Sequence, residues 1–131
     1  MKTIPESHAD ILAKPAFAHL STLMTDGSPH SSAVWVDTDG PTILVNTAEG
    51  RLKDRNVRRD PRVAISVTDP ENPYRSLMIR GRVARITTEG ADEHINRMAK
   101  KYMGVDEYPF RQPGEVRVLY YIEPERVAAM G

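Results

Sequence analysis

The chain contains no cysteine. Disulfide bonds, thiolate nucleophiles and cysteine-ligated metal sites are therefore excluded, and a reducing compartment is expected. No apolar run approaches the roughly 20 residues that span a bilayer, and the first ten residues lack the apolar core of a signal peptide. The sequence thus predicts a cytoplasmic protein with no membrane segment.

An excess of either charge is also lacking, because 18 Lys and Arg residues balance 18 Asp and Glu residues. A neutral chain with only 6% aromatic residues gives no global sign of a nucleic-acid partner. The four histidines are scattered without metal-ligand spacing. Neither a glycine-rich phosphate loop nor a Gly-x-Ser-x-Gly elbow occurs. We therefore expect no metal site and no nucleic-acid partner, and the sequence singles out no catalytic side chain.

Alternating apolar residues and turn signals dominate the 131 residues, a length that fits one domain, 1–131. Asp26-Gly27 and Asp39-Gly40 are hairpin signals that join three strands into a predicted antiparallel meander. Gly81, inside a long strand, predicts a bend or bulge. The predicted strands are 16–24, 29–37, 42–47, 62–69, 74–87 and 116–123, and the predicted helices are 5–14, 51–60 and 88–103. Six strands, mostly adjacent in sequence, favour an α+β antiparallel barrel over a doubly wound sheet.

Positive charge is concentrated in one segment, residues 47–62, directly after a predicted strand. The segment holds six of the 18 basic residues: Arg51, Lys53, Arg55, Arg58, Arg59 and Arg62. Gly50 at the start of the predicted helix leaves backbone N–H groups open to an anion. Such an arrangement is typical of anion binding, and phosphate is the commonest anion.

A helical wheel divides this segment into two sides. Four arginines share one face: Arg51, Arg55, Arg58 and Arg59. Lys53 and Asn56 lie near the opposite face, between Leu52 and Val57, where a surface helix normally carries apolar residues. Polar groups there need partners, which a ligand with phosphate and hydroxyl oxygens would supply. A merely solvated basic face is the alternative, and Arg58 and Arg59 are expected at such a solvated rim.

Six short motifs together resemble one family, over about Ala16 to Val127. They are Asp26-Gly27-Ser28-Pro29-His30, Ala33-Val34-Trp35, Asn46-Thr47-Ala48-Glu49-Gly50-Arg51-Leu52-Lys53, Arg55-Asn56-Val57-Arg58-Arg59-Asp60-Pro61-Arg62, Asn72-Pro73-Tyr74-Arg75 and Ile79-Arg80-Gly81. The pattern resembles the pyridoxamine-phosphate-oxidase-like split-barrel flavoproteins. It is most similar to the actinobacterial branch that uses the deazaflavin coenzyme F420 rather than FMN.

The resemblance implies a split β-barrel and a homodimer with cofactor sites at the subunit interface. By position, Arg51 and Lys53 match the residues that hold the cofactor phosphate and the start of its acidic tail. Asn56 matches the residue that reaches the polyol chain. The excess of arginine in the segment suits the extra carboxylates of the deazaflavin.

Other site residues implied by the resemblance lie on strands. The second strand, through Ser32, Ala33, Val34 and Trp35, is expected to run along the tricyclic ring. Asn46 and Thr47 are expected to line the same site, and Tyr74 to supply an aromatic wall from the partner subunit. For Trp35, a place in the core or at the dimer interface is an equal alternative.

The function implied is hydride transfer from reduced F420 to a small organic or conjugated substrate, chemistry that belongs to the cofactor. We therefore name no catalytic acid or base. An FMN-binding oxidoreductase of the same fold and a non-catalytic module that binds the cofactor or haem remain as alternatives.

Overall fold

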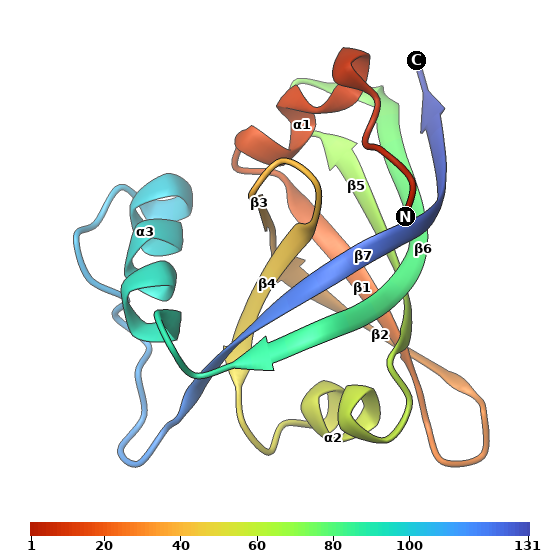
Figure 1. Ribbon diagram of the computed structural model, residues 1–131. Helices are drawn as coiled ribbons and strands as arrows, with labels where there is room; N and C mark the ends of the chain where they lie inside the picture. The colour runs from red at the N-terminus through yellow and green to blue at the C-terminus, as the bar shows by residue number, and fades with distance from the viewer.

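Seven antiparallel strands form one curled sheet in the computed structural model, which describes all residues from 1 to 131. The elements in chain order are η1 (Glu6–His8), α1 (Asp10–Ala13), β1 (Phe17–Leu23), β2 (Pro29–Trp35), β3 (Asp37–Thr38), β4 (Ile43–Ala48), α2 (Leu52–Arg59), β5 (Arg62–Asp69), β6 (Asn72–Thr87), α3 (Ala91–Met103) and β7 (Arg117–Met130). In Figure 1, α2 lies across one end of the barrel, η1 and α1 lie at the other, and α3 lies beside β4. The predicted antiparallel barrel with short flanking helices is confirmed, although it has seven strands rather than six.

The sheet closes because its two outermost strands belong to one chain segment. The strand order is β2-β1-β5-β6-β7-β4-β3, and only Val36 separates β2 from β3. Residues 29–35 of this segment pair with β1, whereas Asp37 and Thr38 pair with Leu44 and Ile43 of β4. The segment therefore changes partner at Val36, and the barrel is split there.

The predicted three-stranded meander was only partly right. The Asp26-Gly27 hairpin joins β1 and β2, and the Asp39-Gly40 turn joins β3 and β4. The long partner of β4 is β7, however, with which it pairs from Ile43 to Ala48. Alternation in a sequence shows which side chains face inward, but it does not identify the neighbouring strand.

The backbone of Val36 is satisfied by side chains of α3. Its N–H donates to the Tyr102 hydroxyl at 2.9 Å, and its carbonyl accepts from Lys101 Nζ at 2.7 Å. The Tyr102 hydroxyl in turn donates to the Ala16 carbonyl at 2.6 Å. Buried backbone N–H and C=O groups without partners would destabilise the fold. Side chains of α3 therefore supply the hydrogen bonds that a neighbouring strand supplies elsewhere in the sheet.

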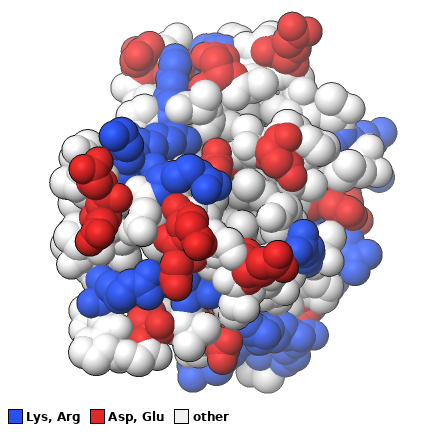
Figure 2. All heavy atoms as spheres, turned by 60° about the vertical axis from the view of Figure 1, so that its left-hand side comes forward, with Lys and Arg blue, Asp and Glu red and all other residues white.

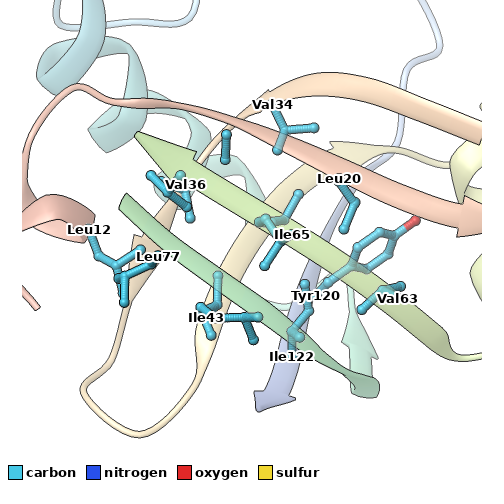
Figure 3. Packing of buried hydrophobic residues seen from close by; sticks show 14 of the residues in the cluster. Leu12, Leu20, Val34, Val36, Ile43, Val63, Ile65, Leu77, Tyr120 and Ile122 are labelled. Carbon is cyan, nitrogen blue, oxygen red and sulfur yellow. The ribbon is translucent and has the colours of Figure 1, made fainter. Parts of the chain in front are cut away.

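The barrel interior is filled by apolar side chains from all the long strands (Figure 3). The predicted inward set of β5 is confirmed, because Val63, Ile65 and Val67 are all buried. Leu12 of α1 and Val57 of α2 contribute from the two ends. None of the helices combines the length and the hydrophobicity that crossing a bilayer requires.

Helix α2 is fixed to the barrel by a buried carboxylate. Asp54 is only 1% exposed, and it accepts hydrogen bonds from Tyr120 Oη at 2.6 Å, from Gly50 N at 3.0 Å and from Arg58 Nε at 3.0 Å. Burial opposes its ionisation, but these hydrogen bonds outweigh burial and keep the pKa of Asp54 below its usual value. The sequence had predicted α2 and its end before Pro61, but not this anchor.

Several boundaries differ from the predictions. The first helix is a 3-10 turn followed by the short α1, and the third begins at Ala91 rather than at residue 88. The last strand continues past residue 123 to Met130, because β6 extends alongside it. The bulge predicted at Gly81 is confirmed by register shifts between Arg80 and Gly81 and between Val83 and Arg85.

Replacing Gly81 with alanine should destabilise the fold by about 1–3 kcal/mol. A Cβ at this position would overlap the backbone carbonyl of Glu123, which no side-chain rotation can relieve. Urea unfolding would measure the loss. The control is Arg82→Ala, one residue away and exposed, which should change the free energy of unfolding by less than about 0.5 kcal/mol. Equal stability of the two variants would contradict the bulge argument.

The Asp54 anchor predicts a defined pH dependence. The pKa of Asp54 in the fold lies below the ordinary 3.8, so its ionised form stabilises the protein above about pH 4, and this contribution is lost as the pH falls further. Asp54→Asn should therefore cost about 1–3 kcal/mol of unfolding free energy near pH 7. The difference from wild type should shrink in acid.

Urea unfolding at several pH values would test this. Asp106→Asn, at an exposed carboxylate, is the control and should show no such trend. A difference between wild type and Asp54→Asn that stays constant from neutral to acid pH would be inconsistent with a buried, ionised anchor.

Candidate functional site

A cavity of about 190 Å³ opens at the split, between β2, β4, the start of α2 and α3. Seven residues predicted from the sequence line it: Ala33, Val34, Trp35, Asn46, Thr47, Arg51 and Lys53. They come from three elements that are separate in the sequence. The closure of the barrel brings them together, because it places β2 and β4 on opposite sides of the gap.

Three basic side chains converge on this cavity. Arg51 and Lys53 stand at the start of α2, and Arg117 stands at the start of β7. Arg51 Nη2 and Arg117 Nη1 both lie 3.4 Å from Oε1 of Glu115, whose side chain is 5% exposed. Two of the three positive charges thus share one buried carboxylate, and the surplus makes the cavity attractive to an anion.

Lys53 has no acidic partner of its own. Burial, together with the positive charges of Arg51 and Arg117, lowers the pKa of Lys53 below its usual value. Burial likewise lowers the pKa of Arg117, although Glu115 opposes that shift. An anion bound between these groups would offset both the burial of Lys53 and its repulsion by Arg51 and Arg117.

Aromatic rings line the cavity beside these cations, and the Tyr108 ring lies 5.0 Å from the guanidinium carbon of Arg117. Trp35 stacks on Tyr102, with ring centroids 4.9 Å apart and planes 10° apart. Tyr108 meets Trp35 edge-on at 6.1 Å, and Phe110 meets Tyr108 at 5.7 Å. Aromatic rings next to a group of cations suit a ligand with a flat ring and an anionic tail.

The residues present fit a phosphate-bearing cofactor. Thr47 Oγ1 is buried without a hydrogen-bond partner, and so is Arg117 Nη1. Both residues line the cavity, beside the unpaired ammonium of Lys53. Buried polar atoms of this kind are normally satisfied, and phosphate and hydroxyl oxygens would satisfy all three.

Three predicted residues do not line the cavity. Ser32 adjoins it on β2, with its hydroxyl buried and unpaired. Asn56 is buried as the wheel predicted, but its amide donates to Thr22 Oγ1 at 3.0 Å and accepts from Arg59 at 3.0 Å. Tyr74, on β6, is 81% exposed, and its expected role in a partner subunit stays a prediction.

The sequence reasoning missed six residues that line the cavity: Phe17, Ile95, Met98, Tyr108, Phe110 and Arg117. Most are apolar or aromatic residues without a distinguishing pattern. Arg117 did carry a signal, because it is a lone charge in the strand-like run Val-Arg-Val-Leu-Tyr-Tyr-Ile at 116–122. A charge at a buried strand position requires a partner, and here the partners are Asn46 and Glu115.

The surface around α3 carries both signs of charge. Figure 2 shows Lys and Arg side chains interspersed with Asp and Glu side chains over this face. Several of them form ion pairs, including Arg111 with Asp92 at 2.9 Å. Positive and negative side chains are therefore mixed on this face.

Comparison with known proteins agrees with this fold. The family model described as pyridoxamine 5'-phosphate oxidase matches residues 4–131. No curated protein matches the chain.

Among solved structures, an F420 reductase is 31% identical with a TM-score of 0.83, covering 95% of this chain and 98% of its own. A conserved hypothetical protein from Mycobacterium tuberculosis is 27% identical with a TM-score of 0.73, covering 97% and 84%. A putative pyridoxamine 5'-phosphate oxidase from Listeria innocua, at 22% identity and a TM-score of 0.67 over 92% of each chain, shares the fold. The chain therefore belongs to the pyridoxamine 5'-phosphate oxidase family, on the branch of the F420 reductase that it resembles.

Proposed function

We propose that the chain is an oxidoreductase that binds the deazaflavin coenzyme F420 in the cavity at the split. The observation that carries this proposal is the group of three cations, Arg51, Lys53 and Arg117, of which only the two arginines meet a carboxylate, together with the aromatic residues that line the same cavity. Membership of the family and the likeness to an F420 reductase support it. The reaction is hydride transfer to a small organic or conjugated substrate.

Each wall of the cavity has a proposed task. Arg51 and Lys53 hold the phosphate and the start of the acidic tail, and Arg117 adds a third cation that the sequence reasoning had not assigned. The backbone of β2 from Ser32 to Trp35 lies along the ring, and the aromatic side chains keep water from it. The bound cofactor supplies the hydride, and the chain binds, orients and shields.

Asn56 receives a different role from the one expected. Its amide is used by Thr22 and Arg59 inside the chain, so it positions α2 and with it Lys53. Arg58 and Arg59 are likewise engaged, with Asp54 and with the Leu23 carbonyl. Of the outer arginines, Arg55 alone has a side chain without a hydrogen bond or ion pair within the chain, and that side chain is exposed and free to meet a long anionic tail.

We also propose that the protein acts as a cytoplasmic homodimer with the cofactor at the subunit interface. Exposed large apolar side chains on β6 and β7 support this, among them Tyr74, Met78 and Met130. Burying such groups between subunits is favourable. In that assembly Tyr74 would contribute an aromatic wall to the partner's site.

FMN is the alternative cofactor, because it shares the ring, the polyol and the phosphate. Its single phosphate needs fewer cations than the cavity and its mouth provide, which favours the more anionic deazaflavin. A non-catalytic module that binds the cofactor or haem is the other candidate. Stopped-flow oxidation of bound reduced cofactor by quinones, enones and tetrapyrroles separates these possibilities, and no turnover with any acceptor would favour the non-catalytic module.

Fluorescence titration with each cofactor tests the assignment directly. We expect the deazaflavin to bind in the micromolar range or tighter and FMN to bind at least about tenfold more weakly, since the extra carboxylates add charge-assisted contacts. Titration at low and high salt at one pH reports how much of the difference is electrostatic. Tight binding of FMN with none of the deazaflavin would overturn the branch-specific proposal.

Lys53→Met should weaken cofactor binding by about tenfold or more, because a hydrogen bond to a charged group is worth roughly 1.5–3 kcal/mol. The substitution removes the ammonium and keeps most of the side-chain length. Lys100→Met makes the same chemical change at an exposed position of α3 and should leave affinity unchanged. If the two variants bind the cofactor equally well, Lys53 does not contact the anion.

A further inference from the structure

A buried histidine stands directly behind the cavity. His94, on the first turns of α3, is 1% exposed. Its Nε2 lies 3.0 Å from Oδ2 of Asp37, and its Nδ1 lies 3.2 Å from Nδ2 of Asn46. The imidazole thus connects a carboxylate on β3 to an amide on β4, and only the amide belongs to a residue that lines the cavity.

The amide of Asn46 can take only one orientation. Its nitrogen lies 2.8 Å from the carbonyl oxygen of Ala91, and its oxygen lies 2.9 Å from Nε of Arg117. A carbonyl only accepts and Arg117 Nε–H only donates. The reverse orientation would therefore place oxygen against oxygen and N–H against N–H. Consequently both N–H groups of the amide point toward α3.

The orientation of the amide fixes the tautomer of His94. Because Asn46 Nδ2 donates, Nδ1 of His94 must accept, and its single proton resides on Nε2. That proton is donated to Asp37. Burial opposes ionisation of Asp37, but the hydrogen bonds from His94 and from the Thr38 backbone prevail, and the pKa of Asp37 lies below its usual value. In this arrangement every polar atom of the imidazole and of the amide is satisfied.

Arg117 is the end of this series of contacts. Its Nε is held by Asn46, and its guanidinium carbon lies 5.0 Å above the ring of Tyr108. Asn46 thus fixes the Nε edge of the guanidinium, and Tyr108 covers one of its faces. The remaining Nη edge is directed toward Glu115 and the cavity, where Nη1 has no hydrogen bond. The direction in which Arg117 presents its free N–H groups thus depends on Asn46.

We propose that His94 is a positioning residue for anion binding: as the neutral Nε2–H tautomer held by Asp37, it accepts the second N–H of the Asn46 amide, whose first N–H goes to the Ala91 carbonyl, and so restrains the amide that holds the guanidinium of Arg117 toward the cavity. The inference rests on the proposed function only for the identity of the anion that Arg117 meets. His94 itself touches neither the ligand nor the reacting atoms.

Two substitutions separate this role from simple packing. In His94→Asn the side-chain oxygen replaces Nδ1 and still accepts from Asn46, whereas contact with Asp37 is lost. In His94→Gln the longer amide still reaches Asp37, whereas Asn46 loses its acceptor. We expect affinity for F420 to fall about tenfold in His94→Gln and to stay within about threefold of wild type in His94→Asn.

The free energy of unfolding should rank the two variants in the opposite order from their affinity for F420, with His94→Asn the less stable. Asparagine is smaller than glutamine, so it leaves the larger space and should give the lower free energy of unfolding by urea. If His94 served only to fill space, His94→Asn would therefore also bind F420 more weakly than His94→Gln. His8→Gln is the control, because His8 is also buried and bonded, to Ser7 and to the Met130 carbonyl, but lies outside this network. It should leave affinity unchanged. Equal affinities of His94→Asn and His94→Gln, or weaker binding by His94→Asn, would refute the positioning role.

A second measurement needs no cofactor and so distinguishes failure of this inference from failure of the proposed function. In ¹⁵N-labelled, ligand-free protein at neutral pH, His94 should show a protonated Nε2 and an unprotonated Nδ1. The Arg117 Nε–H signal should be sharp in wild type and in His94→Asn, and broadened in His94→Gln. A protonated Nδ1 in wild type, or an Arg117 signal that is the same in all three proteins, would overturn the inference even if F420 binds.

Discussion

The backbone of one residue, Val36, connects the fold to its cavity. The segment from residue 29 to residue 38 serves two neighbours, β1 and then β4, and the exchange leaves the Val36 amide without a strand partner. Tyr102 and Lys101 supply the missing hydrogen bonds, so α3 must lie against the split. Because α3 lies there, Ile95 and Met98 line the cavity, and Tyr102 becomes the ring on which Trp35 stacks. The cavity is thus a consequence of how the barrel closes.

Adjacent residues of α2 serve opposite purposes. Asp54 turns into the barrel, where Tyr120 and the Gly50 backbone hold it, and Lys53 turns toward the cavity, where no carboxylate meets it. The first contact fixes the helix, and the second leaves a charge available. Because Asp54 fixes α2 to the barrel, the helix can present the unpaired ammonium of Lys53 at the cavity without changing its position.

Local patterns in the sequence predicted what depends on local chemistry. The alternation of Val63, Ile65 and Val67, the bulge at Gly81 and the burial of Asn56 follow from periods and turn residues, and all three are present. What the sequence could not predict depends on distant partners. Asp54 is indistinguishable from a surface acid until Tyr120, 66 residues away, is placed beside it. Arg117 joins the cavity only because β7 pairs with β4, a pairing that no alternation reveals.

Glu115 has a consequence for how tightly any anion can be held. Its buried carboxylate already lies beside Arg51 and Arg117, so a phosphate bound in the cavity would compete with an internal counter-ion. The binding free energy is then the difference between two anion–arginine contacts, and not the full value of the new one. The residue also belongs to the connection between α3 and β7, which carries Tyr108 and Phe110. Replacing Glu115 by a bound anion at these arginines would therefore act on the same chain segment that places Tyr108 and Phe110 in the cavity.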